Sequence, residues 1–226
     1  MKTEQHPLSN SYNLNPAICY TSFMPNTSII DFFNAHKQII VFDTEFTTWE
    51  GAWARNWSGH NEHREIVQIA AQMIDLETEQ IIDSFSCLVK PNINPVLSDY
   101  FIQLTSITQE LVEREGISFA DAYQEFDTWT AQLPIFCYAR KTGESADRGV
   151  FEENLRLYEL NLPLDVSRYD TLTGLFQDAG VDTTKYSSGE LYRFFNLSLD
   201  GHVHNAMHDV DSLVASLFAI KKLSNI

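Results

Sequence analysis

The sequence lacks the features that mark a membrane or secreted protein. No apolar run reaches the roughly 18 residues of a membrane span, and residues 1–20 have neither the basic nor the apolar region of a signal peptide. Cysteine is scarce: the chain has only Cys19, Cys87 and Cys137, and no CxxC pair. This pattern argues against a disulfide framework and a cysteine-type zinc site, and it is typical of reduced thiols. We therefore predict a cytoplasmic location and no membrane partner.

Basic residues are also few. The chain has 15 Lys and Arg against 31 Asp and Glu, which gives a formal net charge of −16. Such a surface serves solubility. The acidic charge argues against non-specific binding along a long nucleic acid, because such binding gains much of its affinity from basic residues that neutralise phosphates. Any activity on nucleic acid would therefore engage few phosphates near a chain end, with metal ions supplying positive charge.

Length and apolar patterning predict one folded domain after an N-terminal extension. Residues 1–35 are rich in Asn, Ser and Pro and show no sustained period, although the segment 27–33 could pack against a domain. The rest of the chain is long enough to bury one sizeable core. We predict an extension over residues 1–35 and a single domain over residues 36–226.

Apolar runs and their periods predict an α/β fold. Strands are predicted at 38–46, 65–75, 79–90 and 133–139, and helices around 105–116, 118–133, 147–158 and 203–223. Residues 91–101 are interpreted as a loop. A hairpin followed by helices and a further strand predicts a mixed sheet covered by helices.

Two acids stand at the end of the first predicted strand, in "QIIVFDTEF". Asp43 and Glu45 are two residues apart, so a strand projects them from the same face. At about 4 Å and an effective dielectric near 20, two like charges repel by roughly 4 kcal/mol. If the pair were buried, one carboxylate would need a proton or both would need a cation. Taken alone, the pair is better explained by a solvated strand end.

A third acid, Asp147, opens the helix predicted at 147–158. An aspartate at this place is commonly an ordinary N-terminal cap. Glu144 lies in the same polar loop, but Asp147 is the better candidate because Val150 and Phe151 then fall on the inner face of the helix.

His204 and Asp209 lie around the start of the last predicted helix. Five helical steps separate two side chains by about 140°, so these two converge only if His204 lies on the loop before the helix. Gly201 makes such a loop plausible. A lone histidine is usually a surface residue, so the argument depends on the whole set of residues.

Taken together, these residues resemble the motifs of the DEDD superfamily of 3′–5′ exonucleases, in its DEDDh subgroup. "FDTEFT" resembles the first motif, "DRGVF" the second and "HNAMHD" the third, with four residues between His and Asp. "LTSITQELV" is similar to a segment of the RNA-trimming branch. The resemblance covers residues from about 38 to 222 and makes residues 36–226 an exonuclease domain. It implies a ribonuclease H-like mixed β-sheet of about five strands, flanked by helices on both faces.

The resemblance also implies a chemistry. Asp43, Glu45, Asp147 and Asp209 would hold two Mg²⁺ or Mn²⁺ ions, since oxygen ligands suit these cations better than zinc. Two such ions stabilise both oxygens of an in-line displacement at phosphorus. His204 would be the general base that deprotonates the attacking water. The predicted function is hydrolysis of phosphodiester bonds from the 3′ end of single-stranded or short nucleic acid, RNA being favoured over DNA, with release of nucleoside 5′-monophosphates.

The segment between the first motif and the next strand holds three of the four tryptophans. These rings could stack on terminal bases, or they could form an aromatic mini-core that closes a long loop. The residues predicted to bind substrate are Thr44, Phe46, Thr47, Trp49, Trp53, Arg55 and Trp57.

Two other function classes stay open on the sequence. His202, His204 and His208 include an i, i+4 pair with zinc-ligand spacing, which would suit a zinc-dependent hydrolase. That alternative lacks the glutamate of an HExxH motif and leaves the three earlier acids unexplained. The other class is a non-catalytic exonuclease-like module that binds nucleic acid or protein. Such modules have usually lost one of the five motif residues, and all five are present here.

Overall fold

The structure is a computed structural model that describes residues 27–140 and 146–225. Its elements are α1 (Thr27–Ala35), β1 (Gln38–Phe46), β2 (Ile66–Asp75), β3 (Gln80–Leu88), α2 (Asp99–Thr105), α3 (Gln109–Glu115), α4 (Phe119–Trp129), β4 (Ile135–Cys137), α5 (Ala146–Leu157), η1 (Val166–Arg168), β5 (Tyr169–Thr171), α6 (Thr173–Asp178), η2 (Ser188–Arg193) and α7 (Ala206–Ser224). None of the helices in these two ranges is long and apolar enough to cross a membrane.

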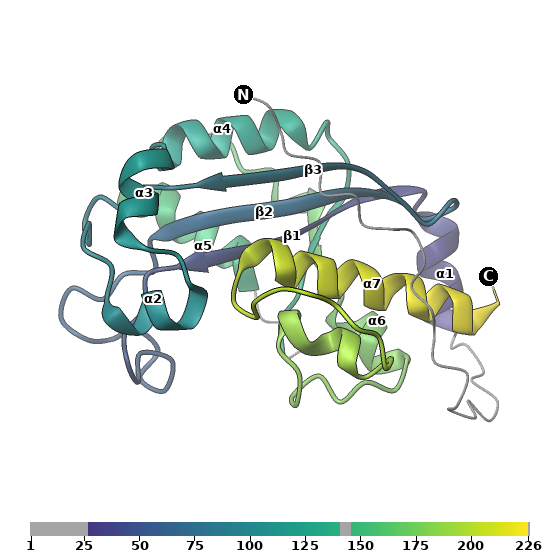
Figure 1. The fold of residues 1–226 in the computed structure, drawn as a ribbon. Helices are drawn as coiled ribbons and strands as arrows, with labels where there is room; N and C mark the ends of the chain where they lie inside the picture. The colour runs from purple at the N-terminus through teal and green to yellow at the C-terminus, as the bar shows by residue number, and fades with distance from the viewer. Residues whose placement is uncertain (1–26, 141–145, 226) are drawn as a thin grey trace.

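The strands form one mixed sheet in the order β3-β2-β1-β4-β5. The neighbours β1 and β2 are antiparallel, as are β2 and β3. The pairs β1–β4 and β4–β5 are parallel. The predicted mixed sheet of about five strands is therefore confirmed, and β1 is its central strand (Figure 1).

Strand alternation divides the apolar core between the two faces of the sheet. On β1, Ile39 and Val41 face a cluster built mainly from α1, α6, η2 and α7. Ile40 and Phe42 face the opposite cluster, which includes α4 and α5. Because each face must be covered to bury a strand that is apolar on both sides, the helices lie on both faces, as predicted (Figure 1). The ends of β1 therefore mark the few places where this strand can present polar groups.

Six described elements lie where no helix or strand was predicted: α1, α2, η1, β5, α6 and η2. The segment 91–101 was interpreted as a loop, but α2 begins within it, with Ser98 accepting a hydrogen bond from the Phe101 N–H. Strand β5 has three residues, too few to show a period. The last helix begins at Ala206 rather than near residue 203, because the Asn205 side chain caps it at Met207.

Helix α1 packs on the sheet although it falls within the predicted extension. Its Ile29 and Phe33 are buried in the cluster beneath α7. Phe32 stacks on His36, and it meets Phe136 of β4 edge to face with these two ring centroids 5.4 Å apart. The segment 27–33 thus packs as the sequence allowed, and the boundary of the exonuclease domain at residue 36 stays a prediction.

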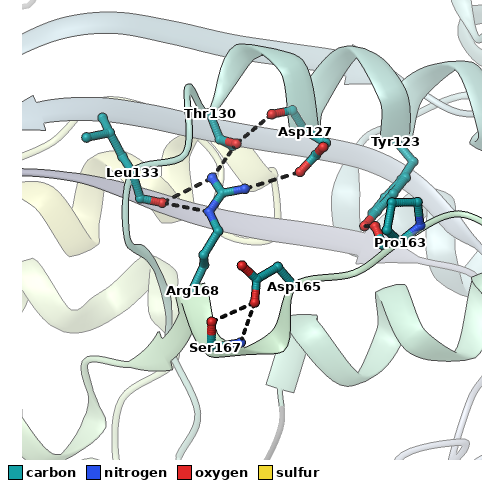
Figure 2. Close-up of polar contacts among 8 residues, drawn as sticks. All are labelled: Tyr123, Asp127, Thr130, Leu133, Pro163, Asp165, Ser167 and Arg168. Carbon is teal, nitrogen blue, oxygen red and sulfur yellow. Dashed lines mark hydrogen bonds and ion pairs between the residues drawn. The ribbon is translucent and has the colours of Figure 1, made fainter.

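A partly buried arginine fixes the outer edge of the sheet (Figure 2). The Arg168 guanidinium donates to the Leu133 carbonyl at 3.1 and 3.2 Å and to Thr130 Oγ1 at 2.6 Å. It also pairs with Asp127 at 3.2 Å. Asp127 and Thr130 lie at the C-terminal end of α4, where a cation is favoured by the helix dipole. Arg168 therefore ties the entry of β5 to the segment that enters β4.

Candidate active site

The four predicted acids converge at the C-terminal end of β1. Asp43 and Glu45 come from β1 itself, Asp147 from the first turn of α5, and Asp209 from the first turn of α7. Their exposed fractions are only 6%, 8%, 7% and 2%, respectively. The solvated strand end that the sequence left open is therefore wrong, and the carboxylates face one another in a buried cluster.

Thr44 points to the other side of β1 and holds Asp147. The carboxylate Oδ1 of Asp147 accepts hydrogen bonds from the Thr44 backbone N–H at 3.0 Å and from its hydroxyl at 2.6 Å. Asp147 thus docks on the strand end itself. Thr44 was predicted to bind substrate, but it is buried and its hydroxyl is engaged with a carboxylate. The alternative acid Glu144 lies outside the described residues.

His204 lies on the loop before α7, the one place from which it could meet Asp209. Its φ of +69° is left-handed, and its backbone N–H donates to Asp209 Oδ1 at 3.1 Å. Ligand atoms of Glu45, His204 and Asp209 all lie within 4.8 Å of one another. The half-buried ring therefore stands beside two carboxylates, within reach of water.

A glycine shapes this loop. Gly201 has a φ of +141°, and a Cβ at this position would lie 2.3 Å from Nδ1 of the buried His208 ring. The loop can therefore approach α7 this closely only without a side chain. The His208 ring therefore lies against this loop, with its Nε2 near the carbonyl of Gly189.

Residues of η2 complete the site, and sequence reasoning missed them. Ser188 Oγ donates to Asp209 Oδ2 at 2.7 Å. A Cβ on Gly189 would lie 2.2 Å from Asp209 Oδ1, so the backbone can approach the carboxylate this closely only without a side chain. The available signal was "SSGE", in which Ser187 and Glu190 form a capping box. That pattern predicts a helical turn but does not place it beside Asp209.

Burial raises the pKa of all four carboxyl groups. For Asp43 burial is the largest cause, followed by the charges of Asp147, Asp209 and Glu45. The pKa of Glu45 rises for the same kinds of reason. Burial raises the pKa of Asp147 from 3.8 to about 6, although the hydrogen bonds from Thr44 lower it. The pKa of Asp209 is raised by burial and lowered in part by Ser188 and His204.

This donor set fits divalent cations. Carboxylates that are buried together raise each other's pKa because they repel, and a cation between them removes that repulsion. Oxygen ligands of this kind suit Mg²⁺ and Mn²⁺. The residues present therefore match the metal that the motifs implied, and its identity belongs to the proposal below.

The three histidines of the zinc alternative do not converge. His202 Nδ1 lies 2.6 Å from the carbonyl of Val203, and His208 Nε2 lies 3.3 Å from the carbonyl of Gly189. Only His204 joins a group that could hold a metal among residues 27–140 and 146–225. The predicted i, i+4 pair is wrong because His204 precedes the helix that carries His208.

Some of the remaining residues predicted to bind substrate are instead bonded within the protein, and others lie on its surface. Thr47 is buried, donating to the His63 carbonyl at 2.6 Å and accepting from the Glu65 N–H at 3.0 Å. Arg55 is paired with Glu62, its Nε lying 2.9 Å from the carboxylate. These two residues therefore hold the segment's own structure.

The aromatic residues form a cluster beside β1. The Trp57 ring lies edge to face against Phe46 and against Trp53, each with a centroid distance of 5.6 Å. Trp53 is 70% exposed, whereas Trp49 and Trp57 are half-buried. Trp57 therefore belongs to an aromatic mini-core, as one interpretation had it, while Trp53 is open to solvent and base stacking stays a prediction.

The sequence matches the family model described as "Exonuclease" over residues 40–217, more than half of the chain. It is 35% identical over 89 residues to the 3′–5′ exonuclease eri1 of Schizosaccharomyces pombe, covering 39% of this chain and 28% of that protein. It is 32% identical over 95 residues to ERI1 exoribonuclease 2 of Homo sapiens, covering 42% of this chain and 13% of that protein. The matches thus span less than a third of the length of these curated relatives.

The fold is similar to that of the nuclease domain of 3′hExo, a DEDDh family member solved bound to rAMP. The TM-score is 0.66 at 20% sequence identity, and the match covers 84% of this chain and 93% of the other. At this identity the similarity speaks for the fold. The family match confirms the resemblance to exonucleases that the motifs indicated, and the shared fold agrees with the predicted ribonuclease H-like sheet.

Proposed function

The chain belongs to the exonuclease family, and from this premise we propose that it is a divalent-metal-dependent 3′–5′ exonuclease. It hydrolyses phosphodiester bonds from the 3′ end of single-stranded or short nucleic acid and releases nucleoside 5′-monophosphates. The observation that carries the proposal is the burial of four carboxylates around the end of β1, with His204 beside them.

In this proposal the four acids share the task of binding metal. Asp43, Glu45, Asp147 and Asp209 hold two Mg²⁺ or Mn²⁺ ions. When bound, these cations supply the positive charge that stabilises an in-line displacement at phosphorus. Thr44 orients Asp147, and Ser188 orients Asp209.

His204 is the proposed general base. Its ring is half-buried beside Glu45 and Asp209, and an imidazole can take up a proton near neutral pH. It accepts the proton of the attacking water. Because its backbone N–H is bound to Asp209, the ring is positioned by a residue that also holds metal.

RNA is the proposed substrate in preference to DNA. One similar protein is named an exoribonuclease, and the fold neighbour was solved with rAMP. We also propose a cytoplasmic location, which is supported by the free thiols of Cys87 and Cys137.

The test uses a 5′-labelled single-stranded RNA and its DNA twin, incubated with Mg²⁺, Mn²⁺, Zn²⁺ or EDTA. We expect a ladder that shortens from the 3′ end with Mg²⁺ or Mn²⁺, and no cleavage in EDTA or with Asp43→Asn. Ile82→Ala, at an exposed position of β3 near the opposite end of the sheet, should behave as wild type. Cleavage that survives EDTA, or that Asp43→Asn leaves intact, contradicts the proposal.

A further inference from the structure

The segment after β1 exposes Trp53 to solvent, and a hydrogen-bonded turn over residues 52–57 supports this tryptophan. The last turn of the segment ends in a Schellman-type arrangement: the Asn56 N–H donates to the Trp53 carbonyl at 3.2 Å and the Trp57 N–H to the Ala52 carbonyl at 3.0 Å. Asn56 takes the left-handed φ of +52° that this ending requires, a conformation that asparagine tolerates well. This turn sets the Trp53 ring against the Trp57 ring.

Trp57 in turn is held by both sides of the catalytic centre. It packs on Phe46, the residue that follows Glu45 on β1. The Arg64 guanidinium lies 5.5 Å from the Trp57 ring centroid and is paired with Glu153 at 2.6 Å. Glu153 belongs to α5, the helix that carries Asp147. Trp53 is therefore fixed relative to the strand and the helix that supply the carboxylates.

The charges of this segment show which contact it can offer. Arg55 is engaged with Glu62 and with the carbonyl of Glu50 at 2.9 Å, and Arg64 is engaged with Glu153. Both arginines are thus committed within the protein, in a chain whose net charge is −16. Phosphate neutralisation is a poor source of affinity here. Stacking of a base on an aromatic ring needs no positive charge and accepts any base.

We infer that Trp53 is the platform on which an unpaired base near the 3′ end of the substrate stacks. A base inside a duplex is covered on both faces by its neighbours, whereas an unpaired base is free to lie on the ring. The inference rests on the proposed function. It assigns substrate binding to Trp53, whereas Trp57, Phe46 and Arg64 position the platform.

The experiment combines a protein change with a substrate change. Trp53→Ala and Trp53→Phe are compared with wild type on a 5′-labelled RNA of twelve adenylates, and on copies with one abasic site at each of the last four positions. Stacking is worth about 5- to 150-fold in affinity. We expect Trp53→Ala to raise KM within that range with little change in kcat, and Trp53→Phe to recover most of the loss.

At the position that stacks, removing the base from the RNA should cost wild type the same factor. In Trp53→Ala the abasic site should cost almost nothing more, because the partner ring is gone. Ile82→Ala, an equally simple truncation at a 47% exposed residue, should leave every value unchanged. Two outcomes overturn the inference. In the first, Trp53→Ala and the abasic site raise KM independently, so that their factors multiply at all four positions. In the second, the Trp53→Ala variant equals wild type.

Fluorescence anisotropy of the same labelled RNA in Ca²⁺ separates this inference from the proposed function. An inactive chain whose RNA affinity still depends on Trp53 overturns the proposed function alone. An active chain whose RNA affinity is indifferent to Trp53 overturns the inference alone. A chain that neither cleaves nor binds the RNA overturns both.

Discussion

Replacing Asp147 with asparagine should stabilise the metal-free protein at alkaline pH. The native pKa of Asp147 is about 6, against an ordinary 3.8, so the ionised form is disfavoured by folding. At 1.36 kcal/mol for each pKa unit, that difference corresponds to about 3 kcal/mol. Asparagine carries no charge and keeps an oxygen that can accept the hydrogen bonds of Thr44.

The sign of the effect follows from the raised pKa. The folded protein holds the Asp147 proton more tightly than the unfolded chain does. The contribution of Asp147 to the free energy of unfolding is therefore lost as pH rises from about 3.8 through about 6. Asp147→Asn should therefore be more stable than wild type by about 3 kcal/mol at pH 8. The two proteins should be nearly equal at pH 4. For a chain of this size, the gain corresponds to roughly 6–12 °C in Tm.

The assay is urea unfolding followed by circular dichroism, in EDTA, at each pH between 4 and 8. Asp31→Asn, at an exposed position of α1, is the matched control and should change little at any pH. An Asp147→Asn variant that gains nothing at pH 8 would refute the electrostatic reasoning. A gain of the same size at pH 4 would also refute it, because the effect would then be packing rather than charge.

Added metal should narrow this difference in stability. A cation that binds only the folded protein stabilises it by about 2.7 kcal/mol at one hundred times its Kd. Wild type should gain that amount in Mg²⁺ at pH 8, whereas Asp147→Asn, lacking one proposed ligand, should gain less. Equal gains in the two proteins would contradict the assignment of Asp147 to the metal site.

Three further predictions concern His204, Gly201 and Arg168. His204→Ala should lower single-turnover cleavage by about 10²–10⁴-fold while RNA affinity is retained, and an unchanged rate would deny it the role of base. Gly201→Ala should slow cleavage, because its Cβ would lie 2.3 Å from the His208 ring, whereas Gly174→Ala, with open space around it, should keep full activity. Arg168→Met should lower the free energy of unfolding in urea by about 1–3 kcal/mol, since it leaves Thr130 and the Leu133 carbonyl without their donor. The exposed pair of Arg114 with Glu115 gives the control, for which Arg114→Met should cost less than about 1 kcal/mol.

The sequence predicted the parts of the site that depend on local pattern. Asp43 and Glu45 stand at the end of a strongly apolar strand, so both their common face and their place at its tip could be predicted. The condition placed on His204, that it precede the helix, came from helical geometry alone and agrees with its left-handed φ. In each case the relevant neighbours lie within a few residues along the chain.

Contacts between distant segments could not be predicted in this way. Ser188 and Gly189 reach Asp209 across about twenty residues in which no period is visible, and the elements between them are short. The same limit explains the mixed outcome for the tryptophan segment. Thr47 and Trp57 are supports only because His63 and Phe46 lie beside them in the fold, and residue type alone does not distinguish such a support from the exposed Trp53.

The order of the elements along the chain bears on when this protein could first act during its synthesis. Asp43, Glu45 and Asp147 are translated early, but Asp209 and the covering of one sheet face arrive only with α7. A growing chain that ends before α7 holds an uncovered sheet and an incomplete set of carboxylates. Such an intermediate lacks the complete carboxylate cluster on which the proposed activity depends, and it leaves apolar surface for chaperones to shield. The same element that completes the chemistry also completes the core, so activity and stability are acquired in one step.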